Sequence, residues 1–265
     1  MKKILYSLVI ILFISCSTAK NNTGSMSSGF NPVVAHRGAF KKNAFPENSL
    51  ASLQEAIRLG CRGSEFDVRM TADDSLVINH DPEFHKLPIE KTTYKELTAF
   101  TLSNGEKFPT LRAYLLAGLQ NNPGTTLVCE IKPSTISKER AKLIAERVYR
   151  LVTELKATGR VVYISFDYDI LKKLLELNPK VITQFLDGNK TPAELKADGI
   201  KGADYHFSVF RKNPDWITEA RKLGIVLNAW TVNEAADMNW LLDNGFDLIT
   251  TNEPELLADI VKSRK

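Results

Sequence analysis

Four short strings of ionisable residues occur in this chain of 265 residues, and each lies at or beside the end of an apolar run. They are His36-Arg37-Gly38, Glu65-Phe66-Asp67, His80-Asp81 and Glu130-Ile131-Lys132. Three of them follow apolar runs, at 33–35, 76–78 and 126–129, that are typical of short buried strands. Carboxylates, imidazoles and basic side chains together can hold a divalent metal, transfer protons and neutralise a phosphate. Since an α/β barrel places such groups where its strands end, the pattern predicts an active-site rim.

The carboxylates favour a site for a hard metal ion. Glu65 and Asp67 are two residues apart, so on a strand both side chains point to the same face. Two carboxylates held that close repel each other and raise each other's pKa unless a cation lies between them. With Glu130 they form a set of three oxygen donors without sulfur, which suits one divalent cation, Ca²⁺ or Mg²⁺. The alternative is that these acids form ordinary salt bridges with neighbouring basic residues.

The histidines and basic residues of the same strings suit phosphoryl chemistry. His36 and His80 both lie at predicted strand ends, and a histidine can act as base in one step and as acid in the next. Arg37 and Lys132 supply positive charge, and an arginine can bind two phosphate oxygens at once. A purely structural role is the alternative for a single histidine, but two beside three carboxylates favour catalysis.

The remaining sequence predicts the elements that position these groups. Strands are predicted near residues 33, 66, 128, 163, 183, 205, 228 and 248. Helices are predicted over 49–59, from 111, from 144 to 155, and over 170–177, 193–197, 216–223, 234–243 and 255–262. This alternation indicates an α/β fold, a (β/α)8 TIM barrel formed as a single domain by residues 31–265. An open sheet that binds a dinucleotide is disfavoured, because no Gly-x-Gly-x-x-Gly turn follows the first strand.

Three local expectations accompany the barrel. Asn48 or Ser49 is expected to cap the first helix, and Asn233 the helix that begins at Glu234. Residues 81–108 form the longest stretch without a clear period, so we expect an irregular lid or substrate loop there.

In their order along the chain, the motifs resemble the signature of the glycerophosphodiester phosphodiesterases. The resemblance covers roughly residues 32 to 260, and eight ordered strings make it far more specific than any one of them. The strings are His36-Arg37-Gly38, Pro46-Glu47-Asn48-Ser49, Glu65-Phe66-Asp67-Val68, His80-Asp81, Phe108-Pro109-Thr110-Leu111, Glu130-Ile131-Lys132, Ile164-Ser165-Phe166-Asp167 and Ala229-Trp230-Thr231-Val232-Asn233.

The resemblance implies a barrel enzyme that uses one divalent cation to hydrolyse glycerophosphodiesters to an alcohol and sn-glycerol 3-phosphate. It implies that Glu65, Asp67 and Glu130 bind the metal and that His36 and His80 are the acid–base pair. It implies substrate binding by Arg37, Lys132 and Trp230. Glu47 and Asn48 would support the metal shell or the first histidine. Trp230 would form an apolar wall for the substrate, with a packed core position as its alternative.

Some alternatives stay open. The loop after His80 and the string Thr250-Thr251-Asn252, where an aspartate is common, depart from the family pattern. A lysophospholipase D-like enzyme or a glycerophosphoinositol phosphodiesterase would use the same barrel, and a non-catalytic solute-binding lipoprotein is a more distant alternative. The first nucleophile is water or the glycerol 2-hydroxyl.

The first 30 residues predict export. Lys2-Lys3 precede an apolar stretch from Ile4 to Ile14, which is the layout of a signal peptide over residues 1–15. A small residue before Cys16 resembles a bacterial lipobox, which implies a lipid anchor on Cys16 and a flexible tether over 16–30; a plain cleaved signal is the alternative. We therefore expect an exported, membrane-anchored lipoprotein of the cell envelope. A net charge of only +4 argues against nucleic acid as a partner.

Overall fold

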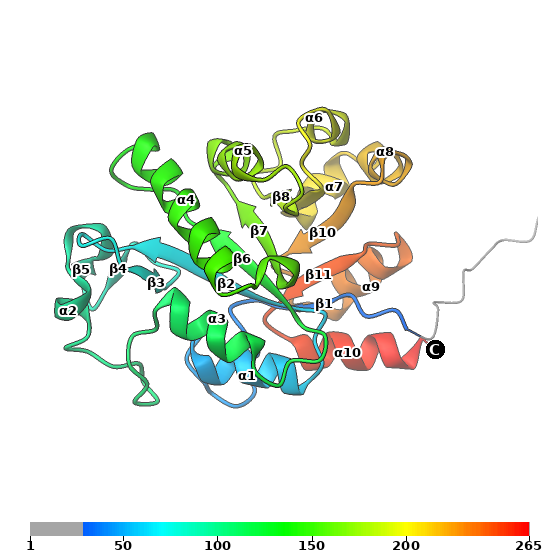
Figure 1. Ribbon diagram of the computed structural model, residues 1–265. Coiled ribbons are helices and arrows are strands. Elements are labelled where there is room, and N and C mark those ends of the chain that lie inside the picture. The colour runs from blue at the N-terminus through cyan, green and yellow to red at the C-terminus, as the bar shows by residue number, and fades with distance from the viewer. Residues whose placement is uncertain (1–28, 265) are drawn as a thin grey trace, which may run out of the picture.

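Eight parallel strands close into a barrel in the computed structural model, which describes residues 29–264. Its ring is completed by the pairing of the first strand with both the second and the last strand (Figure 1). In ring order the strands are β1 (Val33–Ala35), β2 (Gly63–Met70), β6 (Thr126–Ile131), β7 (Val161–Ser165), β8 (Thr183–Phe185), β9 (Gly202–His206), β10 (Val226–Trp230) and β11 (Leu248–Thr251). The predicted (β/α)8 barrel is confirmed, while the predicted signal peptide and Cys16 anchor lie outside the described residues.

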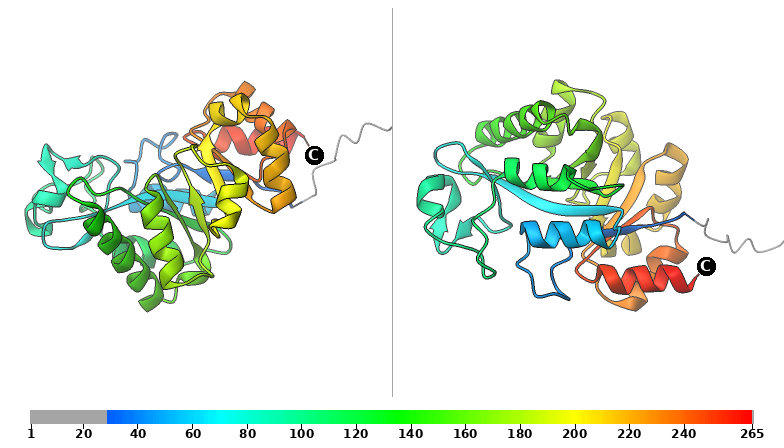
Figure 2. Two further views of the ribbon diagram at one scale, coloured as in Figure 1. Left: turned by 90° about the horizontal axis from the view of Figure 1, so that it is seen from above. Right: turned by 60° about the horizontal axis from the view of Figure 1, so that its bottom comes forward.

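Helices surround the barrel, and neighbours such as α1 and α3 or α4 and α5 pack against each other (Figure 2). They are α1 (Leu50–Arg58), α3 (Leu111–Leu119), α4 (Lys138–Glu154), α5 (Tyr168–Leu177), α6 (Pro192–Ala197), α7 (Phe207–Lys212), α8 (Asp215–Leu223), α9 (Ala235–Asp243) and α10 (Pro254–Ser263). The sequence did not predict the short α7. This helix begins directly where β9 ends, without an intervening loop, and its N-cap is the His206 side chain. None of the described helices has the length and apolar content needed to cross a membrane.

Neither Asn48 nor Asn233 caps a helix, so both side chains can form other hydrogen bonds. Ser49 accepts a hydrogen bond from the Ser52 amide at the start of α1, so Ser49 rather than Asn48 is the cap. At α9 the N-cap is Glu234 without a side-chain cap, so the expectation for Asn233 is wrong. Its Oδ1 instead accepts from the backbone amide of Asn252 at 2.9 Å.

Two apolar layers hold the barrel. The larger one lies between the strands and the surrounding helices. The smaller one fills the barrel interior with Val34, Val128, Ile164 and Leu186. Because Val34 and Val128 come two residues before His36 and Glu130 on their strands, this layer lies beneath the polar residues of the rim.

Residues 81–108 are not irregular, in contrast to the expectation. They contain a hairpin of β4 (Glu83–Phe84) and β5 (Leu87–Pro88), a 3₁₀ turn η1 (Ile89–Lys91) and α2 (Tyr94–Leu97), beside β3 (Leu76–Ile78), which pairs antiparallel to β2 (Figure 1). They have a small apolar core of their own, made by Val77, Ile89, Leu97 and Phe108. No period is visible in the sequence of this segment because its core is assembled from single residues of several short elements.

Two acidic side chains tie this subdomain to the barrel on either side. Buried Glu90 accepts hydrogen bonds from the Ser134 hydroxyl and the Thr135 amide, in the loop that follows β6. Glu106 accepts from the backbone amides of Leu50 and Ala51 at the start of α1. Residues 81–108 are thus anchored to the loop just after Lys132 and to the start of α1 just after Asn48.

Candidate active site

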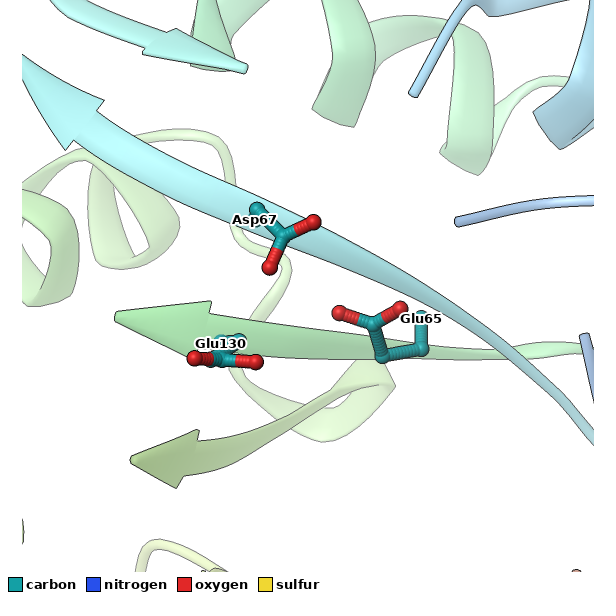
Figure 3. Close-up of side chains that lie close together, drawn as sticks. All are labelled: Glu65, Asp67 and Glu130. Atoms are coloured by element: carbon teal, nitrogen blue, oxygen red, sulfur yellow. The ribbon is translucent and has the colours of Figure 1, made fainter. Parts of the chain in front are cut away.

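The three predicted metal ligands come together at the carboxyl ends of two neighbouring strands. Glu65 and Asp67 lie on β2 and Glu130 lies on β6, with Asp67 and Glu130 paired in register. All three are buried, and a carboxylate oxygen of each lies within 4.8 Å of the others (Figure 3). Alternation along β2 turns both of its acids inward, as the spacing of two predicts.

The electrostatics of this cluster show an excess of negative charge. Burial and the nearby carboxylates raise the pKa of Glu65 well above its ordinary value, and burial with Asp67 raises the pKa of Glu130 to about 7. Burial acts in the same direction on Asp67, but Lys132, His80 and the Asn48 hydrogen bond outweigh it and lower its pKa to about 2. Three carboxylates packed this closely favour a further cation.

The residues present fit such a cation. Lys132 Nζ lies 2.9 Å from Asp67 Oδ1 and 2.8 Å from Glu130 Oε1, so one positive charge already balances part of the cluster. The Oε1 atom of Glu65 is buried and has no hydrogen-bond partner. An all-oxygen donor set with an unpartnered oxygen suits Mg²⁺ or Ca²⁺ rather than a soft metal.

Asn48 holds one of these ligands in place. Its Nδ2 donates to Asp67 Oδ2 at 2.8 Å, and its Oδ1 accepts from the Asp67 amide at 3.2 Å. This geometry places the Asn48 backbone at a φ of 59°, a left-handed conformation that asparagine tolerates better than most residues. Of the two supporting residues predicted, Asn48 is therefore the one that contacts the acid cluster.

Glu47 contacts Arg37 instead. Both of its carboxylate oxygens accept from Arg37 Nη1, at 2.8 and 2.9 Å, while Arg37 Nε lies 3.7 Å from Asp67 Oδ2. The Arg37 backbone amide also donates to Glu65 Oε2 at 2.8 Å. The next residue in this turn must be a glycine. Gly38 has a φ of 81°, and a Cβ at this position would clash with the Ser52 hydroxyl. The guanidinium is thereby held at the pocket, where it can meet an anion.

His36 is oriented by a residue that the sequence did not identify. Its Nδ1 lies 2.7 Å from Asn252 Oδ1, and its Nε2 lies 3.9 Å from Glu65 Oε2. With the amide oxygen assigned to this position, it can only accept, so Nδ1 carries the proton and Nε2 keeps its lone pair. Burial and the charge of Arg37 lower the pKa of His36 to about 4, which keeps the ring neutral near pH 7. Asn252 belongs to the string Thr250-Thr251-Asn252, and the departure of that string from the family pattern was the one signal in the sequence.

His80 is held by its backbone and by its ring. Buried Arg69 donates to the His80 carbonyl oxygen from Nε at 3.0 Å and from Nη2 at 2.6 Å. The Nδ1 atom lies 2.8 Å from Asp81 Oδ1. Sequence reasoning missed Arg69, because only the fold brings its guanidinium under the loop that begins at His80.

One pocket gathers these groups and faces them with an apolar wall. His36, Arg37, Glu65, His80, Glu130 and Lys132 line one part of it. Ile164, Phe166, Leu186 and Trp230 line the other. Trp230 is half-buried, its Nε1 donates to the Asp204 carbonyl at 2.8 Å, and Phe166 packs edge-on against it at 5.4 Å. Trp230 thus lies on the pocket wall, and its role in substrate binding stays a prediction.

Comparison with known proteins agrees with this arrangement. The model of the glycerophosphoryl diester phosphodiesterase family matches residues 36–256, which include every candidate site residue. The chain belongs to the glycerophosphoryl diester phosphodiesterase family. Its similarity to a crystal structure of a glycerophosphodiester phosphodiesterase from Parabacteroides distasonis reaches a TM-score of 0.85 at 39% identity, over 89% of this chain and 99% of that one. The predicted family and barrel are confirmed.

A further relative and a further solved structure are similar to this chain. The chain is 28% identical to the glycerophosphodiester phosphodiesterase of Caldanaerobacter subterraneus, over 87% of this chain and 97% of that protein. A phosphodiesterase from Oleispira antarctica, solved with the product sn-glycerol-3-phosphate, shares the fold with a TM-score of 0.73 at 22% identity, over 88% of this chain and 97% of that one. The chain is therefore a glycerophosphodiester phosphodiesterase with the barrel fold of this family.

Proposed function

We propose that this enzyme releases sn-glycerol 3-phosphate and an alcohol from glycerophosphodiesters with one divalent cation and two acid–base histidines. The observation that carries the proposal is that His36 and His80 line the same pocket as the carboxylate cluster. Glu65, Asp67 and Glu130 would hold the cation, which when bound polarises the phosphate. The product seen in the Oleispira antarctica enzyme supports the choice of substrate.

In this proposal the two histidines transfer protons, and the basic residues neutralise the charge of the phosphate. Neutral His36, with the lone pair of Nε2 free, takes a proton from the nucleophile, which is water or the glycerol 2-hydroxyl. Attack by the 2-hydroxyl expels the alcohol and forms a cyclic phosphate, which water then opens to sn-glycerol 3-phosphate. His80, with Asp81 at its Nδ1, gives a proton to the departing alkoxide. Arg37 binds a phosphate oxygen, and Lys132 balances charge between the phosphate and the acids.

The surface gives the lysophospholipid alternative little support. That alternative calls for an apolar surface around residues 81–108. Within residues 29–264, the large apolar side chains that are well exposed are Leu116, Ile136, Leu143, Phe166, Ile182 and Leu256. None of them lies in 81–108, which favours small, water-soluble diesters.

Hydrolysis of glycerophosphocholine and glycerophosphoethanolamine, with and without chelator, tests the proposal. We expect metal-dependent release of sn-glycerol 3-phosphate, and His36→Ala should lower kcat by about 10²–10⁴-fold because it removes the general base. His85→Ala, an exposed histidine of the β4–β5 hairpin, serves as the control and should leave kcat unchanged. No turnover with any added divalent metal would contradict the proposal.

We also propose that the enzyme is exported and anchored through a lipid on Cys16. The leader over residues 1–15 and the polar tether over 16–30 support this location. Metabolic labelling with palmitate should mark the full chain but not Cys16→Ser. Labelling of both proteins, or of neither, would contradict a lipid on this cysteine.

A further inference from the structure

A buried carboxyl group faces the metal cluster from the far side of the barrel. Asp204 lies on β9, and β9 is the fourth strand from β2 in either direction around the ring, so the two strands are opposite each other. Its side chain is 2% exposed and lines the pocket. The proposed reaction gives this residue no role.

The Asp204 carboxyl has hydrogen-bonding capacity left for a ligand. Asn228, paired with Asp204 in register on β10, acts on this carboxyl as a side-chain hydrogen-bond donor. Oδ1 of Asp204 has no other partner among the described residues, and the carboxyl forms no ion pair with any of them. One donor does not saturate a carboxyl group, and buried polar groups are rarely left with unused capacity. A hydroxyl group, which both donates and accepts, matches this carboxyl group.

The surroundings indicate which hydroxyl would fit. Ile164, Leu186 and Trp230 flank the carboxyl, and the Trp230 N–H is already used by the Asp204 carbonyl. A carbon chain that bears a hydroxyl suits an apolar wall with one polar point. Ile164 and Leu186 also belong to the apolar layer of the barrel interior. The variable alcohol of a diester must leave through the opening, whereas the glycerol is common to all substrates.

We propose that Asp204 binds the glycerol hydroxyl farthest from the phosphate, the C1 hydroxyl, and so selects glycerol among phosphodiester alcohols. This subsite rests on the proposed function, since the cation and the basic residues opposite must hold the phosphate. A carboxyl oxygen accepts from the hydroxyl in either protonation state. Separately, burial raises the pKa of Asp204 well above its ordinary value, so a neutral carboxyl can face an anionic substrate without repelling it.

Calorimetric binding to the full-length protein tests the subsite without turnover. The ligands are sn-glycerol 3-phosphate and its 1-deoxy analogue, 1,2-propanediol phosphate, with Mg²⁺ or Ca²⁺ in excess. Wild type should bind the first about tenfold more tightly, the effect of one buried hydrogen bond. Asp204→Leu should bring this ratio to about one through weaker binding of glycerol 3-phosphate, and Asp204→Asn should keep most of it, because an amide oxygen still accepts.

Several outcomes would overturn the subsite. Equal binding of the two ligands to wild type would do so even if Asp204→Leu failed to fold. A folded Asp204→Leu protein with an unchanged ratio would do so too. If Asp204→Leu changed KM for glycerophosphocholine but not the affinity for glycerol 3-phosphate, the carboxyl would contact the headgroup instead. The control Asp259→Leu, an exposed residue of α10, should keep the wild-type ratio.

Hydrolysis of glycerophosphocholine by wild type, measured in parallel, separates the two proposals. Absence of hydrolysis with a tenfold binding ratio would contradict the proposed function and leave the subsite standing. Hydrolysis without a binding ratio would do the reverse.

Discussion

The two walls of the pocket are built in different ways. On the wall of β1, β2 and β6, charged side chains contact one another and polar supports, as Asp67 contacts Asn48 and Arg37 contacts Glu47. On the wall of β7 to β10, the pocket lining is mostly apolar, and within residues 29–264 its one ionisable group is the carboxyl of Asp204. The first wall concentrates charge, whereas the second offers an apolar surface with a single carboxyl group. Charge handling and substrate selection are thus separated across the barrel.

This separation has an energetic basis. Carboxylates gathered in a dry interior repel one another, which is why the pKa values of Glu65 and Glu130 are raised. Such a cluster lowers the stability of the metal-free protein and favours binding of a cation. The opposite wall carries no comparable charge, so substitutions there should change affinity rather than chemistry. The following predictions test this difference, from the largest expected effect to the smallest.

Glu65→Gln should have the largest effect. It removes one charge from the metal ligands and leaves the shape of the wall intact. We expect kcat/KM for glycerophosphocholine to fall by about 10³-fold, since a lost metal ligand costs several kcal/mol of transition-state stabilisation. Glu83→Gln, an exposed acid of the β4–β5 hairpin, is the matched control. Steady-state kinetics over a range of Mg²⁺ and Ca²⁺ concentrations measure both, and equal activity of the two variants would refute the metal assignment.

Arg69→Met should lower kcat by about 10²-fold, because a small displacement of His80 is enough to misplace its proton. KM should change much less. Arg62→Met replaces an exposed arginine just before β2 and should have no effect. Thermal melting separates misplacement from unfolding. A kcat that falls only in proportion to the fraction of unfolded protein at the assay temperature would mean that Arg69 has a structural role alone.

Trp230→Leu tests the opposite wall and should mainly raise KM, by about tenfold, because it removes apolar contact that ground state and transition state share. Trp230→Phe retains an aromatic face and should behave closer to wild type. The comparison of kcat and KM is the measurement. A large fall in kcat at unchanged KM would show that the two walls are not separated in function.

The smallest expected effect is on the stability of the metal-free protein, measured with Glu130→Gln. The folded pKa of Glu130 is about 7, so between roughly pH 4.5 and 7 the folded state binds more protons than the unfolded state, and stability falls as pH rises. Above pH 7 the penalty is complete. The variant lacks it, and after the loss of one partner of Lys132 we expect a net gain of about 1 kcal/mol in the metal-free protein.

Melting curves of metal-free wild type and variant at pH 5 and pH 8 measure this difference. The variant should melt a few degrees higher at pH 8 and nearly equally at pH 5. His36, whose lowered pKa makes stability rise with pH between about 4 and 6.5, contributes to both proteins and cancels in the comparison. A variant that melts lower at pH 8 would show that Glu130 is not under electrostatic strain.

The sequence by itself determined the strands, most of the helices and the ionisable residues that are candidates for catalysis. The spacing of apolar residues that marks a strand or a helix depends on local sequence, so it can be recognised without knowledge of the fold. The helix capped by Ser49 is an example. The spacing of Glu65 and Asp67 likewise fixed their common face, because alternation along a strand is a property of the backbone. These features depend on neighbours within a few residues.

Only the tertiary structure decided which residue contacts which. Asn252 meets His36 across 216 positions of sequence, because closing the barrel brings β11 beside β1. The same closure places Asp204 opposite the acids of β2. No local period records such contacts, since they arise from the order and register of the strands around the ring. The sequence therefore determined the reactive groups, and the closed barrel decided how each one is held.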